Sequence, residues 1–241
     1  MSRRSVLITG ANRSIGFETA RQLGRMGYRV WLGSRDGARG EAAARDLASD
    51  GSDVRGIALD VTDRASVRAA ADLVMREDGK LDVLVNNAGI SGGMEGTPST
   101  QSIDVVREVY ETNVLAPIAV TQAFLPLLKA SGHANVVMVS SGLGSLGWLS
   151  DPSNPHYGIN NLGYNSSKSA LNAVTVAFAK ELAASGIKVN AADPGYTATD
   201  FNNHTGYRTV EQAAAGIVWL ADQDASGPTG GFFFDRTPVP W

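Results

Sequence analysis

The chain has 241 residues, 43% of them hydrophobic and 19% charged, which suits a single α/β domain over residues 1–241. A net charge of −3 gives no basis for a nucleic-acid surface, and the absence of cysteine, with three scattered histidines, gives no basis for disulfides or a metal site. No apolar run reaches the ~18 residues of a membrane span, and the first apolar run stops at Gly10, too short for a secretory signal, so we expect a cytoplasmic protein that does not bind a membrane.

The first half of the chain alternates short apolar runs with amphipathic stretches. Such β-α units, each of about 20–30 residues, are typical of a parallel, doubly wound sheet. Thr62-Asp63 carries an N-cap signal for the third helix. We expect strands at 5–9, 28–33, 54–59 and 81–85, with helices at 17–26, 40–48 and 67–75.

The second half continues the pattern with longer elements. A helical stretch covers 103–128, and Pro117 and Pro126 should bend or interrupt it. The segment 143–162 is rich in Gly, Pro, Asn and Ser, so we expect a loop. Further strands are expected at 135–139, 186–192 and 230–234, and a last helix at 209–220.

The first strand leads into a glycine-containing turn and a helix. Strand, glycine turn and helix together can hold a dinucleotide pyrophosphate at the helix N-terminus. Gly10 permits the tight turn, and Gly16 lets helix and strand pack closely. Ser14 stands where the usual fingerprint has its middle glycine, and its hydroxyl could bond a phosphate oxygen.

Two residues at the end of the second strand give opposite indications of the cofactor. Asp36 lies twenty residues beyond Gly16, the spacing at which an acid often bonds the ribose 2′-OH of NAD. Arg35, with Arg13 from the first loop, could instead bind a 2′-phosphate. The sequence pattern leaves both readings open, together with a third in which the arginines are simply solvated.

Tyr164 and Lys168 are spaced by four residues at the start of a predicted helix. They should therefore lie on one face, one turn apart. A fixed ammonium within about 4–6 Å favours the phenolate and lowers a tyrosine pKa by roughly 1–3 units, which would suit acid/base work near neutral pH. The simpler interpretation is a surface tyrosine and lysine.

Taken together, several motifs resemble those of the short-chain dehydrogenases/reductases, in particular the carbonyl-reductase-like branch. The resemblance covers essentially the whole chain. It implies a Rossmann-like three-layer αβα sandwich with a seven-stranded, mainly parallel sheet. The motifs, in family order, are Thr9-Gly10-x-x-x-Ser14-x-Gly16, Asn86-Asn87-Ala88-Gly89, Asn113, Ser140-Ser141, Tyr164-x-x-x-Lys168 and Pro194-Gly195.

The resemblance also implies a function, the NADP(H)-dependent and reversible reduction of a ketone or aldehyde to an alcohol. Tyr164 would donate the proton to the substrate oxygen, and Lys168 would lower its pKa and bond the nicotinamide ribose. Ser141 would hydrogen-bond the substrate oxygen, with Ser140 as the fallback. Asn113 would hold a water that links Lys168 to solvent.

Cofactor contacts carry over in the same way. In this branch an arginine at the position of Arg35 usually binds the 2′-phosphate, which favours NADP(H), while Asp36 keeps NAD(H) possible. The other implied contacts are Gly10, Asn12, Arg13, Ser14, Ile15 and Gly16 in the first loop, Asp60 and Val61 at the adenine, Asn87, Ala88 and Gly89 at the adenosine side, and Pro194, Gly195, Thr197 and Thr199 at the nicotinamide.

The segment before Tyr164 and the short stretch 199–209 bear on substrate and assembly. We expect a small-molecule carbonyl or alcohol as the substrate, and an open pocket that accepts bulky apolar ketones, bordered by Leu143, Trp148, Tyr157 and Tyr196. The segment between Ser141 and Tyr164 is longer than in most members of the family. The resemblance implies that it could cover the surface that other members use to form tetramers, so we expect either a monomer or a homo-oligomer. Alternative functions are NAD-dependent alcohol oxidation, epimerase or dehydratase chemistry, and non-catalytic dinucleotide sensing.

Overall fold

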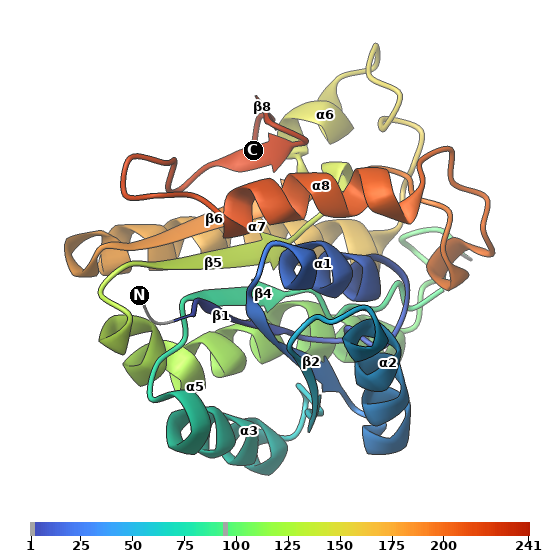
Figure 1. The fold of residues 1–241 in the computed structure, drawn as a ribbon. Coiled ribbons are helices and arrows are strands. Elements are labelled where there is room, and N and C mark those ends of the chain that lie inside the picture. Colours follow the sequence, from blue (N-terminus) through green and yellow to red (C-terminus); the bar gives the residue numbers. More distant parts are fainter. Residues whose placement is uncertain (1–2, 94–95) are drawn as a thin grey trace.

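A computed structural model describes residues 3–93 and 96–241, and one mixed sheet runs through them (Figure 1). Its strand order is β3-β2-β1-β4-β5-β6-β7-β8, and every neighbouring pair is parallel except the antiparallel pair of β7 and β8. The strands are β1 (Ser5–Ile8), β2 (Arg29–Ser34), β3 (Val54–Ala58), β4 (Val83–Asn86), β5 (Ala134–Val139), β6 (Ile187–Asp193), β7 (Phe232–Phe234) and β8 (Thr237–Pro238).

Helices cover both faces of this sheet, as the β-α alternation predicts (Figure 1). The chain therefore forms the expected three-layer αβα sandwich. One face carries α1 (Ser14–Arg25), α2 (Gly37–Ser49) and α8 (Val210–Ala221). The other carries α3 (Arg64–Asp78), α4 (Ile103–Tyr110), α5 (Ala116–Ala130) and α7 (Leu162–Leu182).

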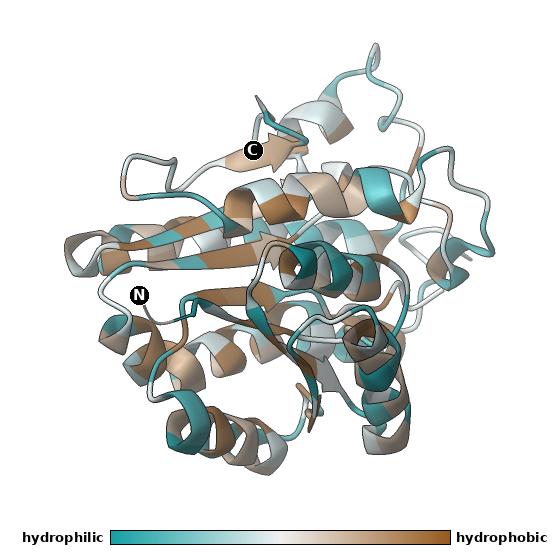
Figure 2. Cartoon of the chain, viewed as in Figure 1, coloured by the Kyte–Doolittle hydropathy of each residue, from teal (hydrophilic) through white to brown (hydrophobic). Residues whose placement is uncertain are grey.

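Two apolar cores lie between the sheet and these layers, one on each face. The central strands are coloured largely as hydrophobic in Figure 2. Successive residues of β1 alternate between the two cores: Val6 and Ile8 belong to the core under α1, α2 and α8, and Leu7 to the core under α3, α5 and α7. A strand buried on both faces has no polar alternation, which is why it reads as a continuous apolar run.

Three local expectations differ from the structure. An eighth strand pairs Pro238 with Phe233, which is possible because an edge strand can dispense with the missing proline N–H. Part of the expected 143–162 loop is helical, with a 3₁₀ turn at Gly142–Gly144 and the short helix α6 (Leu146–Ser150), whose N-cap Ser145 accepts a hydrogen bond from the Trp148 N–H. Pro126 does not interrupt α5.

The helical stretch Ile103–Ala130 is long and apolar enough, by length and composition alone, to cross a membrane, although the sequence analysis expected no run of that length. Half of its most apolar window is buried inside the fold. Its Phe124, Leu127 and Leu128 belong to the core against the sheet. Buried core helices pass the same test, and this packing identifies the stretch as one of them.

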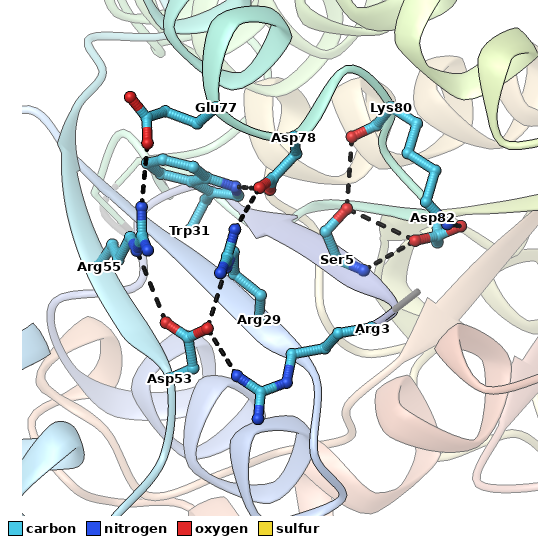
Figure 3. A network of polar contacts seen from close by, with 10 residues as sticks. All are labelled: Arg3, Ser5, Arg29, Trp31, Asp53, Arg55, Glu77, Asp78, Lys80 and Asp82. Atoms are coloured by element: carbon cyan, nitrogen blue, oxygen red, sulfur yellow. Dashed lines mark hydrogen bonds and ion pairs between the residues drawn. The ribbon is translucent and has the colours of Figure 1, made fainter. Parts of the chain in front are cut away.

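A polar network closes the amino-terminal edge of the sheet (Figure 3). Asp78 accepts hydrogen bonds from Arg29 at 2.5 Å and from Trp31 Nε1 at 2.7 Å. Asp53 pairs with Arg29, Arg3 and Arg55 at 2.9, 2.7 and 3.5 Å. The network joins β2, β3 and α3, so it fixes the end of the sheet opposite to the carboxyl edge where α/β sheets bind ligands.

Candidate active site

Tyr164 and Lys168 lie in the first turns of α7, on the helix face turned toward the carboxyl end of β5. The N-cap Asn161 accepts a hydrogen bond from the Tyr164 N–H at 2.9 Å and fixes where the helix begins. The Lys168 ammonium lies 5.6 Å from the centre of the Tyr164 ring. The predicted juxtaposition is therefore confirmed.

Their ionisation differs from the sequence-based expectation. Burial raises the pKa of Tyr164 to about 12, the bond with Ser141 opposes that rise, and Asp193 adds to it. The Tyr164 residue as a whole is half-buried. The expected lowering by Lys168 is wrong for this structure, because desolvation dominates and the ammonium donates instead to the Val139 carbonyl at 2.8 Å. Burial also lowers the pKa of Lys168 to about 8.

The structure separates the two candidate serines. Ser140 is 2% exposed and donates to Asn172 Oδ1 at 2.6 Å, away from the tyrosine. Ser141 is only half-buried, and its side chain bonds the Tyr164 hydroxyl. Of the two, Ser141 therefore has the position from which a substrate oxygen can be shared with Tyr164.

Asn113 lies in a π-helical turn (Glu111–Leu115) between α4 and α5. Its side chain exchanges two hydrogen bonds of 2.9 Å with the backbone of Ile90, and it donates to Ser167 Oγ at 3.0 Å. A Cβ on Gly89 would lie 3.2 Å from Asn113 Oδ1 and 3.6 Å from Lys168 Nζ. The missing side chain of Gly89 leaves this space open beside both groups.

The first glycine loop and the Asn86–Gly89 segment are held against each other. Thr9 Oγ1 accepts hydrogen bonds of 3.0 Å from the N–H groups of Asn87 and Ala88, and Asn87 donates to the Thr9 carbonyl at 2.8 Å. A Cβ on Gly10 would lie 3.1 Å from Ala88 Cα, and one on Gly16 only 2.8 Å from the Gly10 carbonyl oxygen. The glycines are thus required by close backbone approach.

The N-terminus of α1 fits an anion. The N-cap Arg13 makes no side-chain capping bond and the first turn carries no acid, so no side chain within 3–93 and 96–241 accepts from the first helical N–H groups. Ser14 adopts a left-handed φ of 52°, the conformation for which the family pattern uses glycine. Strain of this kind clusters at functional turns. The loop therefore has the chemistry of a pyrophosphate site, and Ser14 preserves its shape.

The competing residues at the end of β2 have separate roles. Asp36 is the N-cap of α2: it accepts a hydrogen bond from the Arg39 N–H at 3.1 Å and pairs with the Arg39 side chain at 3.3 Å. Arg35 is exposed and has no hydrogen bond or ion pair to any residue in 3–93 or 96–241. Arg13 pairs with Asp200 at 3.0 Å.

A cavity of ≈ 510 Å³ between α1 and α2 is lined by Asn12, Arg13 and Arg39, among others. It lies next to the loop that fits the pyrophosphate, and Arg35 precedes α2 on the same edge of the sheet. Asp46 also lines the cavity, so its lining carries two arginines and one acid, and the exposed Arg35 adds a further cation at this edge, where a 2′-phosphate could be bound.

The remaining predicted contacts lie at the same carboxyl edge. The Asp60 side chain is occupied by hydrogen bonds from Thr62, so Asp60 and Val61 form a turn there. Thr197 and Thr199 are 4% and 6% exposed. Thr197 donates to the Pro194 carbonyl at 3.1 Å, and Gly195 has a left-handed φ of 71°. Ile15 is half-buried behind the first loop.

An aromatic residue beside Tyr164 was missed by the sequence analysis. The Phe201 ring lies 5.7 Å from the Tyr164 ring, centre to centre, and is 46% exposed. Tyr196, one of the predicted pocket residues, is exposed and lies 6.2 Å from Tyr207. The available signal was the aromatic content of the short 199–209 stretch.

The other predicted pocket residues differ in how far they are buried. Trp148 packs against Ala191, Phe232 and Val239 and stacks on His156. Its ring is therefore part of the packed interior, and it does not border an open pocket. Leu143 is half-buried, and Tyr157 is 52% exposed.

Comparisons with known proteins identify the family of this chain. The sequence model of the short chain dehydrogenase family matches residues 4–208. The chain is 35% identical to (+)-neomenthol dehydrogenase of Arabidopsis thaliana, covering 98% of this chain and 97% of that one, and 34% identical to carbonyl reductase [NADPH] 3 of Rattus norvegicus, covering 99% and 98%. Among solved structures, NADPH-bound carbonyl reductase from chicken fatty liver matches with a TM-score of 0.86 and 30% identity, and both chains are covered fully. Salutaridine reductase of Papaver somniferum matches with a TM-score of 0.84 and 29% identity, covering 97% of this chain and 100% of that one. The chain therefore belongs to the short-chain dehydrogenase/reductase family of oxidoreductases, in its carbonyl-reductase-like branch.

Proposed function

We propose that this oxidoreductase uses NADPH to reduce a bulky, apolar ketone or aldehyde to its alcohol. The observation that carries the proposal is the convergence of the Tyr164 hydroxyl and Ser141 at one point, with the Lys168 ammonium behind them. Related proteins named carbonyl reductase [NADPH] and a structure with NADPH bound support the choice of chemistry and cofactor.

Each polar group has a defined task in this proposal. When bound, the nicotinamide supplies the hydride for the carbonyl carbon. Tyr164 gives its proton to the oxygen on which negative charge grows, and Ser141 donates a hydrogen bond to the same oxygen. A tyrosine with a pKa of about 12 is protonated at neutral pH, which suits the reductive direction. Lys168 holds the nicotinamide ribose, and Asn113 holds the backbone of Ile90 against that space.

The cofactor choice rests on the end of β2. Asp36 is committed to capping α2 and to Arg39, which leaves Arg35 and the arginines of the adjacent cavity to bind a 2′-phosphate. We expect NADPH to bind much more tightly than NADH, and Arg35→Ala to remove most of that difference. Fluorescence titration with both cofactors measures this, and equal or tighter NADH binding would contradict the proposal.

The catalytic assignment is tested with Tyr164→Phe and a panel of ketones, including the cyclic ketone that corresponds to neomenthol. Loss of the general acid should lower kcat by about 10²–10⁴-fold. NADPH binding should change little, because the phenyl ring still fills the same space. A variant that turns over ketones at the wild-type rate would show that another group delivers the proton.

A further inference from the structure

Asp193 is a buried carboxylate at the end of β6 for which the proposed reaction has no role so far. It is 5% exposed and follows the strand that enters the Pro194-Gly195 turn. Buried acids are rare unless they are paired or hydrogen-bonded. This one therefore needs a physical reason for its position.

The Asp193 side chain bridges two loops of the site. Its Oδ1 accepts the Gly195 N–H at 2.8 Å, inside the turn that would receive the nicotinamide. Its other side faces the residue after Ser141: a Cβ on Gly142 would lie 2.9 Å from Asp193 Oδ2, and the Gly142 N–H also bonds the carboxylate. The carboxylate thus joins the end of β5 to the end of β6, and Gly142 is small enough to admit it.

Charged and titratable groups face Asp193 from three sides. Tyr164 and Lys168 come from α7, and the negative charge of Asp193 raises the pKa of both. Burial raises the pKa of Asp193 itself, and the N–H groups of Gly195 and Gly142 with the charges of His156 and Arg208 oppose that rise. His156 comes from the loop before α7, and its Nε2 would lie 2.8 Å from a Cβ on Gly142. Arg208 comes from the segment before α8, where its charge is already paired with Asp235 at 2.6 Å.

We propose that Asp193 is a positioning residue of the reduction, which joins the residue after Ser141 to the nicotinamide-side turn and places a carboxylate on the side of the site where the Lys168 ammonium lies. Among residues 3–93 and 96–241, no acid forms an ion pair with Lys168 and no cation forms one with Asp193. Lys168 Nζ donates to the Val139 carbonyl, and Val139 pairs with Ala192, the residue before Asp193, so the carboxylate acts on the ammonium through space. The proposal rests on the proposed function, because it assigns Lys168 to the cofactor ribose.

The experiment is a titration of NADPH by fluorescence over pH 6.5–10, with wild type, Asp193→Asn and the control Asp72→Asn, which removes an exposed charge from α3. Neutralising Asp193 removes a charge that favours protonated Lys168, so the pH at which NADPH affinity falls should move lower by about one unit. Asp72→Asn should leave it in place. An unchanged midpoint in folded Asp193→Asn would overturn the proposal, whereas absence of NADPH binding by wild type would overturn the proposed function itself.

A second measurement covers the case in which the asparagine variant does not fold. Carbon-13 NMR of aspartate-labelled wild-type protein reports whether the buried carboxyl is ionised. The proposal requires a carboxylate at neutral pH. A protonated carboxyl there would overturn it independently of any variant and of any turnover.

Discussion

Asp36 provides a sharp test of cofactor choice, because asparagine can keep its capping role and remove only its charge. Asparagine and aspartate are about equally good N-caps, so Asp36→Asn should change the free energy of unfolding by less than about 0.5 kcal/mol. Asp36→Ala removes the acceptor for the Arg39 N–H and should lose about 1 kcal/mol, or roughly 2–4 °C in Tm for a chain of this size. The exposed pair with Arg39 adds little to this.

The assay combines thermal unfolding with titration of NADH and NADPH. Asp63→Ala is the matched control, since Asp63 caps α3 through the Ala65 N–H at 2.8 Å and should lose a similar free energy without any effect on either cofactor. Asp36→Asn should bind NADH as wild type does and NADPH at least as tightly, because a negative charge near the phosphate is gone. A tenfold weaker binding of NADH to Asp36→Asn would refute the reasoning and make Asp36 the ribose ligand.

Three further predictions concern the substrate wall and the opposite edge of the sheet. Phe201→Ala should lower kcat/KM for bulky apolar ketones by about tenfold, the worth of one partly exposed ring contact, while kcat/KM for a small polar ketone stays the same; equal losses for both would contradict the substrate assignment. Asp78→Ala should destabilise the fold by about 2–4 kcal/mol in urea unfolding, because Trp31 Nε1 and Arg29 lose their shared partner; Asp78→Asn should recover part of it. Burial would raise the pKa of Asp82, but hydrogen bonds from Lys80, Ser131 and Ser5 outweigh it and hold that pKa below its ordinary value. Asp82 therefore contributes stability that is complete above its unfolded-state pKa and is lost as pH falls through the lower folded-state pKa. Asp82→Asn should make the free energy of unfolding depend less on pH in the acid range. An unchanged pH dependence would count against this role.

Much of the fold could be predicted because its causes are local. The strands of the central sheet are apolar on both faces, and the helix ends carry their own signals. Thr209 and Gln212 form a capping box at the start of α8, and Gly79 ends α3 in a left-handed conformation. The same holds for the site motifs, since Tyr164 and Lys168 owe their juxtaposition to one helical turn.

Other features depend on segments that are distant in the chain. Spacing could not show that Asp36 points into the first turn of α2, or that Ser140 turns toward Asn172 while Ser141 meets Tyr164. The pKa of Tyr164 follows the same logic: adjacency to an ammonium is a local property, but desolvation is set by everything packed around the hydroxyl.

The sequence by itself thus determined the layers of the fold, the carboxyl-edge motifs and the acid/base pair, because periodicity, capping and helical spacing act over a few residues. Only the tertiary structure decided which of two neighbouring side chains faces the site, and only it brought Phe201 to Tyr164 and Asp193 to Gly142. Those contacts join the ends of different strands and loops. Their geometry depends on sheet order and burial, which no local pattern of residues contains.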